Sequence, residues 1–150
     1  MPRATVAEVS LDAIAHNFRT LMGLTRPATQ CVGIVKADAY GHGAVEIART
    51  LSQLGVRLFA VALLDEAIAL ASAGGIAGRI LVLGYADPSE AEEIVARGFL
   101  CVASSLEQAR ALDGAAEHLR RPAGIHVKFD TGMGRIGFRP DEALPALREL

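Results

Sequence analysis

The sequence lacks the features that mark several large classes of protein. Its net charge is only -2 over 150 residues and 51% of its residues are apolar, which excludes a disordered chain and an electrostatic grip on nucleic acid. Charges interrupt every apolar stretch before it could span a bilayer, and residues 1–5 contain no apolar core of signal-peptide length. We therefore expect a soluble, cytoplasmic protein with neither a membrane nor a nucleic-acid partner.

Cysteine is also scarce, and patterns for metal or acyl-transfer chemistry are missing. Cys31 and Cys101 each fall in a predicted buried strand, where free cysteines pack as small hydrophobic residues, and this favours a reducing compartment. No histidine, cysteine and carboxylate set has metal-ligand spacing, no serine sits in a nucleophile elbow, and no P-loop occurs. We expect no metal cofactor.

What the sequence does have is a repeat of short apolar runs and helix-patterned stretches. The apolar runs occupy residues 30–35, 57–62, 79–84, 99–103 and 124–130. Their starts are about 20 to 27 residues apart, which leaves room for one helix and two short loops each time. This pattern predicts parallel strands joined by right-handed crossovers.

Helix boundary signals support the repeat. Residues 87–90 place a capping aspartate, a first-turn proline and a capping-box glutamate in order, and Gly98 can close that helix. Residues 104–107 repeat the capping pattern. Ser10 can cap a helix whose apolar stripe follows it, so we expect a short strand and an amphipathic helix before the repeat.

Five strand–helix units suit two folds. A five-stranded doubly wound parallel sheet is complete at this length, whereas a (β/α)8 barrel needs about 250 residues. Length favours the complete sheet, and periodicity does not choose between the two.

Lys36 follows the first predicted strand directly, at its carboxyl end, where α/β proteins gather their ligand-binding residues. An amine walled by apolar strands is desolvated, which lowers its pKa and exposes the free base that attacks an aldehyde carbon. Tyr40 adds a ring and a hydroxyl four residues on. On strand position alone, a lysine that reaches past the strand end into solvent is the commoner outcome. We expect His42, in the same loop, to be a turn residue.

Lys128 lies in the fifth predicted strand. Because strand side chains alternate, His126, Lys128 and Asp130 should share one face, opposite the apolar residues that pack under the helices. An inward ammonium must be deprotonated, paired or chemically changed. One outcome is an anionic carbamate held by the neighbouring Arg135. The other is a pair with a carboxylate such as Asp130, or exposure to solvent.

Residues 132–137 also satisfy G-x-G-x-x-G directly after a strand, a weak indication of a dinucleotide-binding unit. In that unit the helix opens inside the glycine motif, which would put Pro140 and Pro145 in its interior. Pro140 fits better as the first residue of a later helix. We therefore rank dinucleotide binding low.

Residues 35–44, VKADAYGHGA, closely resemble the pyridoxal-phosphate attachment motif of the alanine racemase family, and residues 126–138, HVKFDTGMGRIGF, resemble a second segment of that family. The resemblance implies that Lys36 holds pyridoxal 5′-phosphate as an aldimine and is a catalytic base. It implies that Tyr40 contacts the cofactor phosphate, that Arg135 contacts cofactor and substrate carboxylate, and that Lys128 is a possible carbamylated lysine.

The same resemblance implies the fold and the wider protein. Residues 1–150 would form an amino-terminal strand and helix plus about five units of a (β/α)8 TIM-type barrel, with the carboxyl-terminal β domain absent, so that the chain is a fragment. The implied activity is interconversion of L-alanine and D-alanine, supplying D-alanine for peptidoglycan, by a homodimer with a small amino acid substrate. A non-enzymatic pyridoxal-phosphate-binding barrel and a dinucleotide-binding domain are the alternatives.

Overall fold

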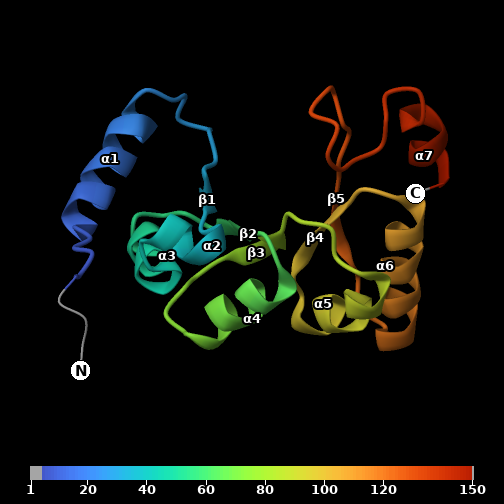
Figure 1. The fold of residues 1–150 in the computed structure, drawn as a ribbon, viewed down its shortest axis with the longest axis horizontal. Helices are drawn as coiled ribbons and strands as arrows, with labels where there is room; N and C mark the ends of the chain where they lie inside the picture. Colours follow the sequence, from blue (N-terminus) through green and yellow to red (C-terminus); the bar gives the residue numbers. More distant parts are fainter. Residues whose placement is uncertain (1–4, 150) are drawn as a thin grey trace.

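The computed structural model describes residues 5–149, which form an α/β fold with one five-stranded sheet (Figure 1). The strands are β1 (Val32–Ile34), β2 (Leu58–Val61), β3 (Arg79–Val82), β4 (Leu100–Ala103) and β5 (Gly124–Val127). The helices are α1 (Leu11–Gly23), α2 (Lys36–Gly41), α3 (Ala44–Gln53), α4 (Leu64–Ser72), the 3-10 turn η1 (Pro88–Glu90), α5 (Ala91–Arg97), α6 (Leu106–Leu119) and α7 (Ala143–Glu149). All five predicted strands are confirmed, each shortened at one or both ends.

The five strands are parallel and lie in the order β1-β2-β3-β4-β5. An order that follows the chain moves in one direction across the sheet, so right-handed crossovers put every connecting helix on the same face. A doubly wound sheet instead reverses direction partway and carries helices on both faces. The doubly wound alternative is therefore wrong, and the barrel-type arc is confirmed.

The two faces of the sheet have different partners. Outward-facing residues such as Phe59 and Val82 belong to one cluster with helix residues such as Ile47, Leu70 and Ile94. The inner cluster consists of strand residues and one residue just beyond a strand: Ala60, Leu81, Leu100 and Val102, with Leu58 and Leu83 packed against them. Each large side chain buried in this way contributes roughly 1.5–3 kcal/mol to stability, so the helix-covered face supplies most of the core.

The ends of the arc are open. Within residues 5–149, β1 pairs only with β2 and β5 only with β4. Val32 and Ile34, which lie opposite Leu58 and Ala60 on the inner face, are 39% and 42% exposed. An arc of five barrel strands leaves open strand edges and exposes apolar interior side chains, and the structure shows both features.

Several predicted helix ends are confirmed by direct hydrogen bonds. The Ala13 amide donates to Ser10 Oγ at 3.2 Å at the start of α1, and the Asp87 amide donates to Glu90 Oε2 at 2.8 Å. The turn that follows Asp87 is 3-10 rather than α, and Gly98 ends α5 in the left-handed region with φ 70°.

Three boundary predictions need correction. No strand occurs in residues 5–10, while residues 1–4 lie outside the described part of the chain. Cys31 is half-buried and precedes β1 by one residue rather than lying inside it. The last helix begins at Ala143 and not at Pro140, because the Glu142 amide donates to the Arg139 carbonyl at 3.0 Å and closes a turn first. None of the helices in residues 5–149 combines the length and hydropathy that a bilayer crossing requires.

The two free cysteines should differ sharply in reactivity. Cys101 is fully buried in β4, and burial, aided by the charge of Glu90, raises the pKa of its thiol to about 11. Since the thiolate is the reactive form, we expect a maleimide at pH 8 to label Cys31 at least about tenfold faster than Cys101 in the native protein. Equal rates after denaturation are the control, and equal rates in the folded chain would contradict the buried position of β4.

Candidate functional site

Lys36 lies two residues beyond Ile34, the last residue of β1. The Val35 amide still continues the sheet by donating to the Ala60 carbonyl at 2.9 Å, and the Val35 side chain is 1% exposed. Lys36 is half-buried, and its Nζ lies 5.8 Å from the centroid of the Tyr40 ring. In the described part of the chain no carboxylate forms an ion pair with it within 4.0 Å. The amine is therefore not held by an acid.

The chain leaves Lys36 in a left-handed turn, which sequence reasoning did not foresee. Ala37, Asp38, Ala39 and Tyr40 have φ between 51° and 56° and ψ between 37° and 49°. For residues other than glycine this conformation costs roughly 1–2 kcal/mol each, or about 4–8 kcal/mol for the four. A left-handed helix repeats every 3.6 residues like its mirror image, so Tyr40 comes back over Lys36 one turn later.

Hydrogen bonds at the far end of the turn offset part of this strain. The Asp38 carbonyl accepts from the Gly43 amide at 2.9 Å, and its Oδ1 accepts from the Ala44 amide at 2.7 Å at the start of α3. His42 Nδ1 lies 3.0 Å from the Ala39 carbonyl oxygen. The predicted role of His42 as a turn residue is confirmed.

Glu66, in the first turn of α4, holds the near end of the turn. Its Oε1 accepts from the Ala37 amide at 2.6 Å, and its Oε2 accepts from the Ala62 and Leu63 amides at 2.7 and 3.1 Å. Sequence reasoning missed this residue. An acid in the first turn of a predicted helix indicates a role at the start of that helix. It does not indicate a hydrogen bond to an amide 29 positions away.

The second motif, residues 126–138, begins within the last two residues of β5 and continues beyond the strand. His126 pairs with Val102 of the inner face and Ile125 with Cys101 of the helix-covered face, so the predicted alternation is confirmed within β5, which ends at Val127 before Lys128 and Asp130. Lys128 lies two residues on, is half-buried, and donates its amide to the Ala103 carbonyl at 2.9 Å. No ion pair with Asp130, or with any other carboxylate among residues 5–149, involves Lys128.

The carboxylate of Asp130 is instead used by the loop that follows it. Its Oδ1 accepts from the Gly132 and Gly134 amides at 2.9 and 3.0 Å, and its Oδ2 accepts from the Arg135 amide at 2.8 Å. These N–H groups, that of Gly132 first, lower the pKa of Asp130 below its ordinary value of 3.8. Asp130 thereby fixes the backbone from which the exposed Arg135 side chain projects.

The conformation of this loop also tests whether residues 132–137 form a dinucleotide-binding motif. The Phe138 amide donates to the Lys128 carbonyl, and the Asp130 amide to the Phe138 carbonyl, both at 2.8 Å. Residues 131–137 between them are irregular, and the next helix starts only at Ala143. A dinucleotide-binding unit needs a helix that opens inside the glycine motif, so that interpretation is wrong.

The structure brings Lys36 and Tyr40 together and leaves the second motif apart from them. Both motifs lie at the carboxyl end of the sheet, but β2, β3 and β4 separate β1 from β5. Of the hydrogen bonds and ion pairs that the structure describes, none joins Lys36 to Lys128 or Arg135. The two loops therefore occupy one edge as separate structures.

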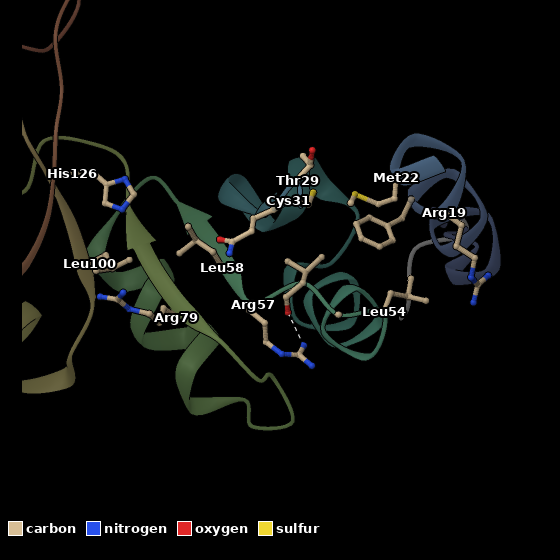
Figure 2. Close-up of a pocket in the computed structure, with 14 residues that line it drawn as sticks. Arg19, Met22, Thr29, Cys31, Leu54, Arg57, Leu58, Arg79, Leu100 and His126 are labelled. Atoms are coloured by element: carbon tan, nitrogen blue, oxygen red, sulfur yellow. Dashed lines mark hydrogen bonds between the residues drawn. The ribbon is translucent and has the colours of Figure 1, made fainter. Parts of the chain in front are cut away.

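A hollow of about 920 Å³ lies at the opposite edge, between α1 and the amino ends of the strands. Figure 2 shows Arg79, Leu100 and His126 on one side of it and residues of α1 on the other. Neither Lys36 nor Arg135 lines this hollow. Because parallel α/β sheets bind ligands at the carboxyl ends of their strands, the Lys36 edge is the candidate site.

Comparison with known proteins gives a consistent result. Residues 9–150 match the family model for the alanine racemase N-terminal domain. The chain is 46% identical over 141 residues to the alanine racemase of Desulfovibrio desulfuricans, covering 94% of this chain and 38% of that protein. It is 45% identical over 151 residues to the alanine racemase of Geobacter sulfurreducens, covering 99% and 39%.

Solved structures agree. An alanine racemase of Clostridium difficile superposes with a TM-score of 0.86 at 38% identity, covering 93% of this chain and 36% of that one. The alanine racemase of Bartonella henselae with covalently bound pyridoxal phosphate gives 0.85 at 28% identity, with coverage of 93% and 40%. The chain thus spans about two fifths of the length of these relatives or slightly less.

The left-handed turn predicts an unusual response to glycine. Ala37→Gly removes a Cβ that is strained at φ 51°, so we expect the free energy of unfolding to stay unchanged or rise by up to about 1 kcal/mol. The matched change Ala69→Gly, exposed in the right-handed helix α4, should lower it by about 0.5–1 kcal/mol. Urea unfolding measures both values, and equal losses would contradict the left-handed conformation.

The Asp130 loop should depend on pH. Because the folded-state pKa of Asp130 lies below 3.8, its ionised form stabilises the loop at neutral pH, and this contribution is lost as the pH falls below 3.8 and through the folded value. Asp130→Asn, with one acceptor oxygen in place of two, should loosen residues 131–137 already at pH 7. Amide exchange of Gly132 and Gly134 by NMR measures both effects. The exposed Asp113→Asn in α6 is the control, and a loop equally loose in both variants would refute the assignment.

Proposed function

We propose, since this chain belongs to the alanine racemase family, that it forms the lysine-bearing part of an amino acid racemase that uses pyridoxal 5′-phosphate. The observation that carries the proposal is the placement of Lys36. Its amine stands at the carboxyl end of β1, free of any acid within residues 5–149, beside the Tyr40 ring and on a turn held from both ends.

The residues at this edge fit the cofactor that the family implies. When bound, pyridoxal phosphate supplies an electrophilic aldehyde carbon and an electron sink for the charge that develops at the substrate α-carbon. Lys36 Nζ would bond covalently to that carbon, whose oxygen would leave as water, as the unpaired amine of a half-buried lysine allows. We assign the Tyr40 hydroxyl to the cofactor phosphate, because the left-handed turn keeps its ring beside Lys36.

Lys36 would also move the α-proton. Once its Nζ is released by the incoming amino acid, the neutral amine can remove or return the α-proton on one face of the substrate. Racemisation needs a second acid-base group on the opposite face. The resemblance to the family implies that this second group is a tyrosine from the carboxyl-terminal domain of the partner subunit. We assign no residue of this chain to that role.

Arg135 and Lys128 complete the proposed set. We assign Arg135 to the substrate carboxylate and the phenolic oxygen of the cofactor, because a guanidinium binds such anions through paired donors. Lys128 is half-buried and unpaired within the described residues, which supports its reaction with carbon dioxide. Its neutral Nζ forms an N–C bond and releases a proton, and Arg135 would pair with the resulting carbamate anion.

The remaining assignments concern the whole protein. We propose alanine as substrate, D-alanine for peptidoglycan as the use of the product, a cytoplasmic location, and a head-to-tail homodimer in which each site is completed by the other subunit. Residues 1–150 would then be the amino-terminal helix and the first five barrel units, joined in the racemase to a carboxyl-terminal β domain. The family match over residues 9–150 supports these proposals.

Covalent trapping at Lys36 tests the proposed function. Lys36 and Lys128 are the only lysines of the sequence, so borohydride reduction after addition of pyridoxal phosphate can be mapped without ambiguity. We expect the adduct mass on Lys36, its loss in Lys36→Arg, and its retention in the matched Lys128→Arg. In the natural protein that carries this sequence, Lys36→Arg should also lower the interconversion of L- and D-alanine by at least about a hundredfold.

Two results would contradict the proposal. A folded protein that gives no adduct on Lys36 does not hold the cofactor as proposed. An adduct with no racemisation in the natural protein would favour a non-enzymatic pyridoxal-phosphate-binding barrel.

A further inference from the structure

We propose that Glu66 is a positioning residue for Lys36, an inference that rests on the proposed function of that lysine. Glu66 belongs to the second strand–helix unit, whereas Lys36 belongs to the first. Among residues 5–149, Glu66 forms neither a hydrogen bond nor an ion pair with the lysine side chain. It acts through the backbone of the next residue, Ala37.

The hydrogen bond between Ala37 and Glu66 lies where the backbone enters the left-handed conformation. Ala37 is the first of the four left-handed residues, and its amide donates to Glu66 Oε1 at 2.6 Å. A second bond, from the Ala39 amide to the Val35 carbonyl at 2.9 Å, joins the turn to the residue that precedes Lys36. Glu66 therefore fixes the peptide that joins Lys36 to the turn, and with it the direction in which the lysine side chain leaves the backbone.

Glu66 is itself fixed to the sheet. Its other oxygen accepts from the Ala62 and Leu63 amides, which follow β2 directly, at 2.7 and 3.1 Å. One carboxylate thus ties the exit of β1 to the exit of β2. These strands are neighbours in the sheet, so the carboxylate spans a single inter-strand gap and adds a lateral link beyond the last backbone pair.

The link requires both carboxylate oxygens. Three N–H groups point at Glu66, from residues 37, 62 and 63, and they are divided between Oε1 and Oε2. A glutamine has the same shape but one acceptor oxygen, and its NH2 group would face a donor on the other side. Glu66→Gln must therefore give up either the bond to Ala37 or the bonds at the start of α4.

The experiment compares Glu66→Gln with Glu107→Gln in the natural protein that carries this sequence. Glu107 lies in the first turn of α6, is exposed, and its side chain makes no hydrogen bond among the described residues, so it is a matched control for charge, residue type and helix position. The first readout is hydrogen exchange of residues 37–44 without cofactor, with β4 peptides as a check on the fold. The second is the rate at which the absorbance of lysine-attached pyridoxal phosphate appears, with the adduct mapped to Lys36.

We expect Glu66→Gln to speed exchange in residues 37–44 and to slow attachment at Lys36, each by at least about tenfold, the size expected for a lost charge-assisted hydrogen bond. Exchange in β4 should not change, and Glu107→Gln should match the natural sequence in both readouts. Attachment at the natural rate, or unchanged exchange in residues 37–44, overturns the proposal.

Failure of the proposed function would look different. If the natural sequence itself attaches no cofactor, the proposed role of Lys36 fails, and exchange alone decides whether Glu66 fixes the turn. Faster exchange confined to residues 37–44 in Glu66→Gln then supports the positioning role, and equal exchange in both variants overturns it.

Discussion

The left-handed turn at residues 37–40 is the constraint on which the candidate site depends. It is an unfavourable conformation for alanine, aspartate and tyrosine, and hydrogen bonds at its two ends offset part of its cost. Glu66 holds its beginning and Asp38, through the start of α3, holds its end. A right-handed continuation would carry Tyr40 in a different direction, and Lys36 would lose the ring that lies beside its amine.

The same arrangement occurs at both motif-bearing loops. After β1, Glu66 accepts three backbone N–H groups, and after β5, Asp130 accepts three more. Each carboxylate lies close to one of the two lysines of the sequence without forming an ion pair with it. Because the backbone uses the acids, both amines stay free for chemistry, and the charge of the acids serves to shape the loops.

Sequence reasoning predicted the features that are encoded locally. Short apolar runs marked all five strands, and the capping roles of Ser10 and Asp87 followed from residues at most three positions away. The site was predicted less completely. Lys36 was placed at its strand end, but the hand of the turn is set by the contact between Glu66 and Ala37, which no local pattern reports. Periodicity did not choose between barrel and doubly wound sheet; the family resemblance favoured the barrel, and the strand order, a property of long-range pairing, confirms it.

Strand order also bears on how the chain acquires its structure. Each strand of the sheet pairs with the strand before it in sequence, one strand–helix unit earlier, so every pairing needs only the unit that has just been completed. A chain with this connectivity can assemble in the direction of its synthesis, adding units to a growing edge as they leave the ribosome. The hydrogen bond between Glu66 and Ala37 can then form only after the second unit has been synthesised. The lysine loop reaches its final shape only when the second unit has folded against the first.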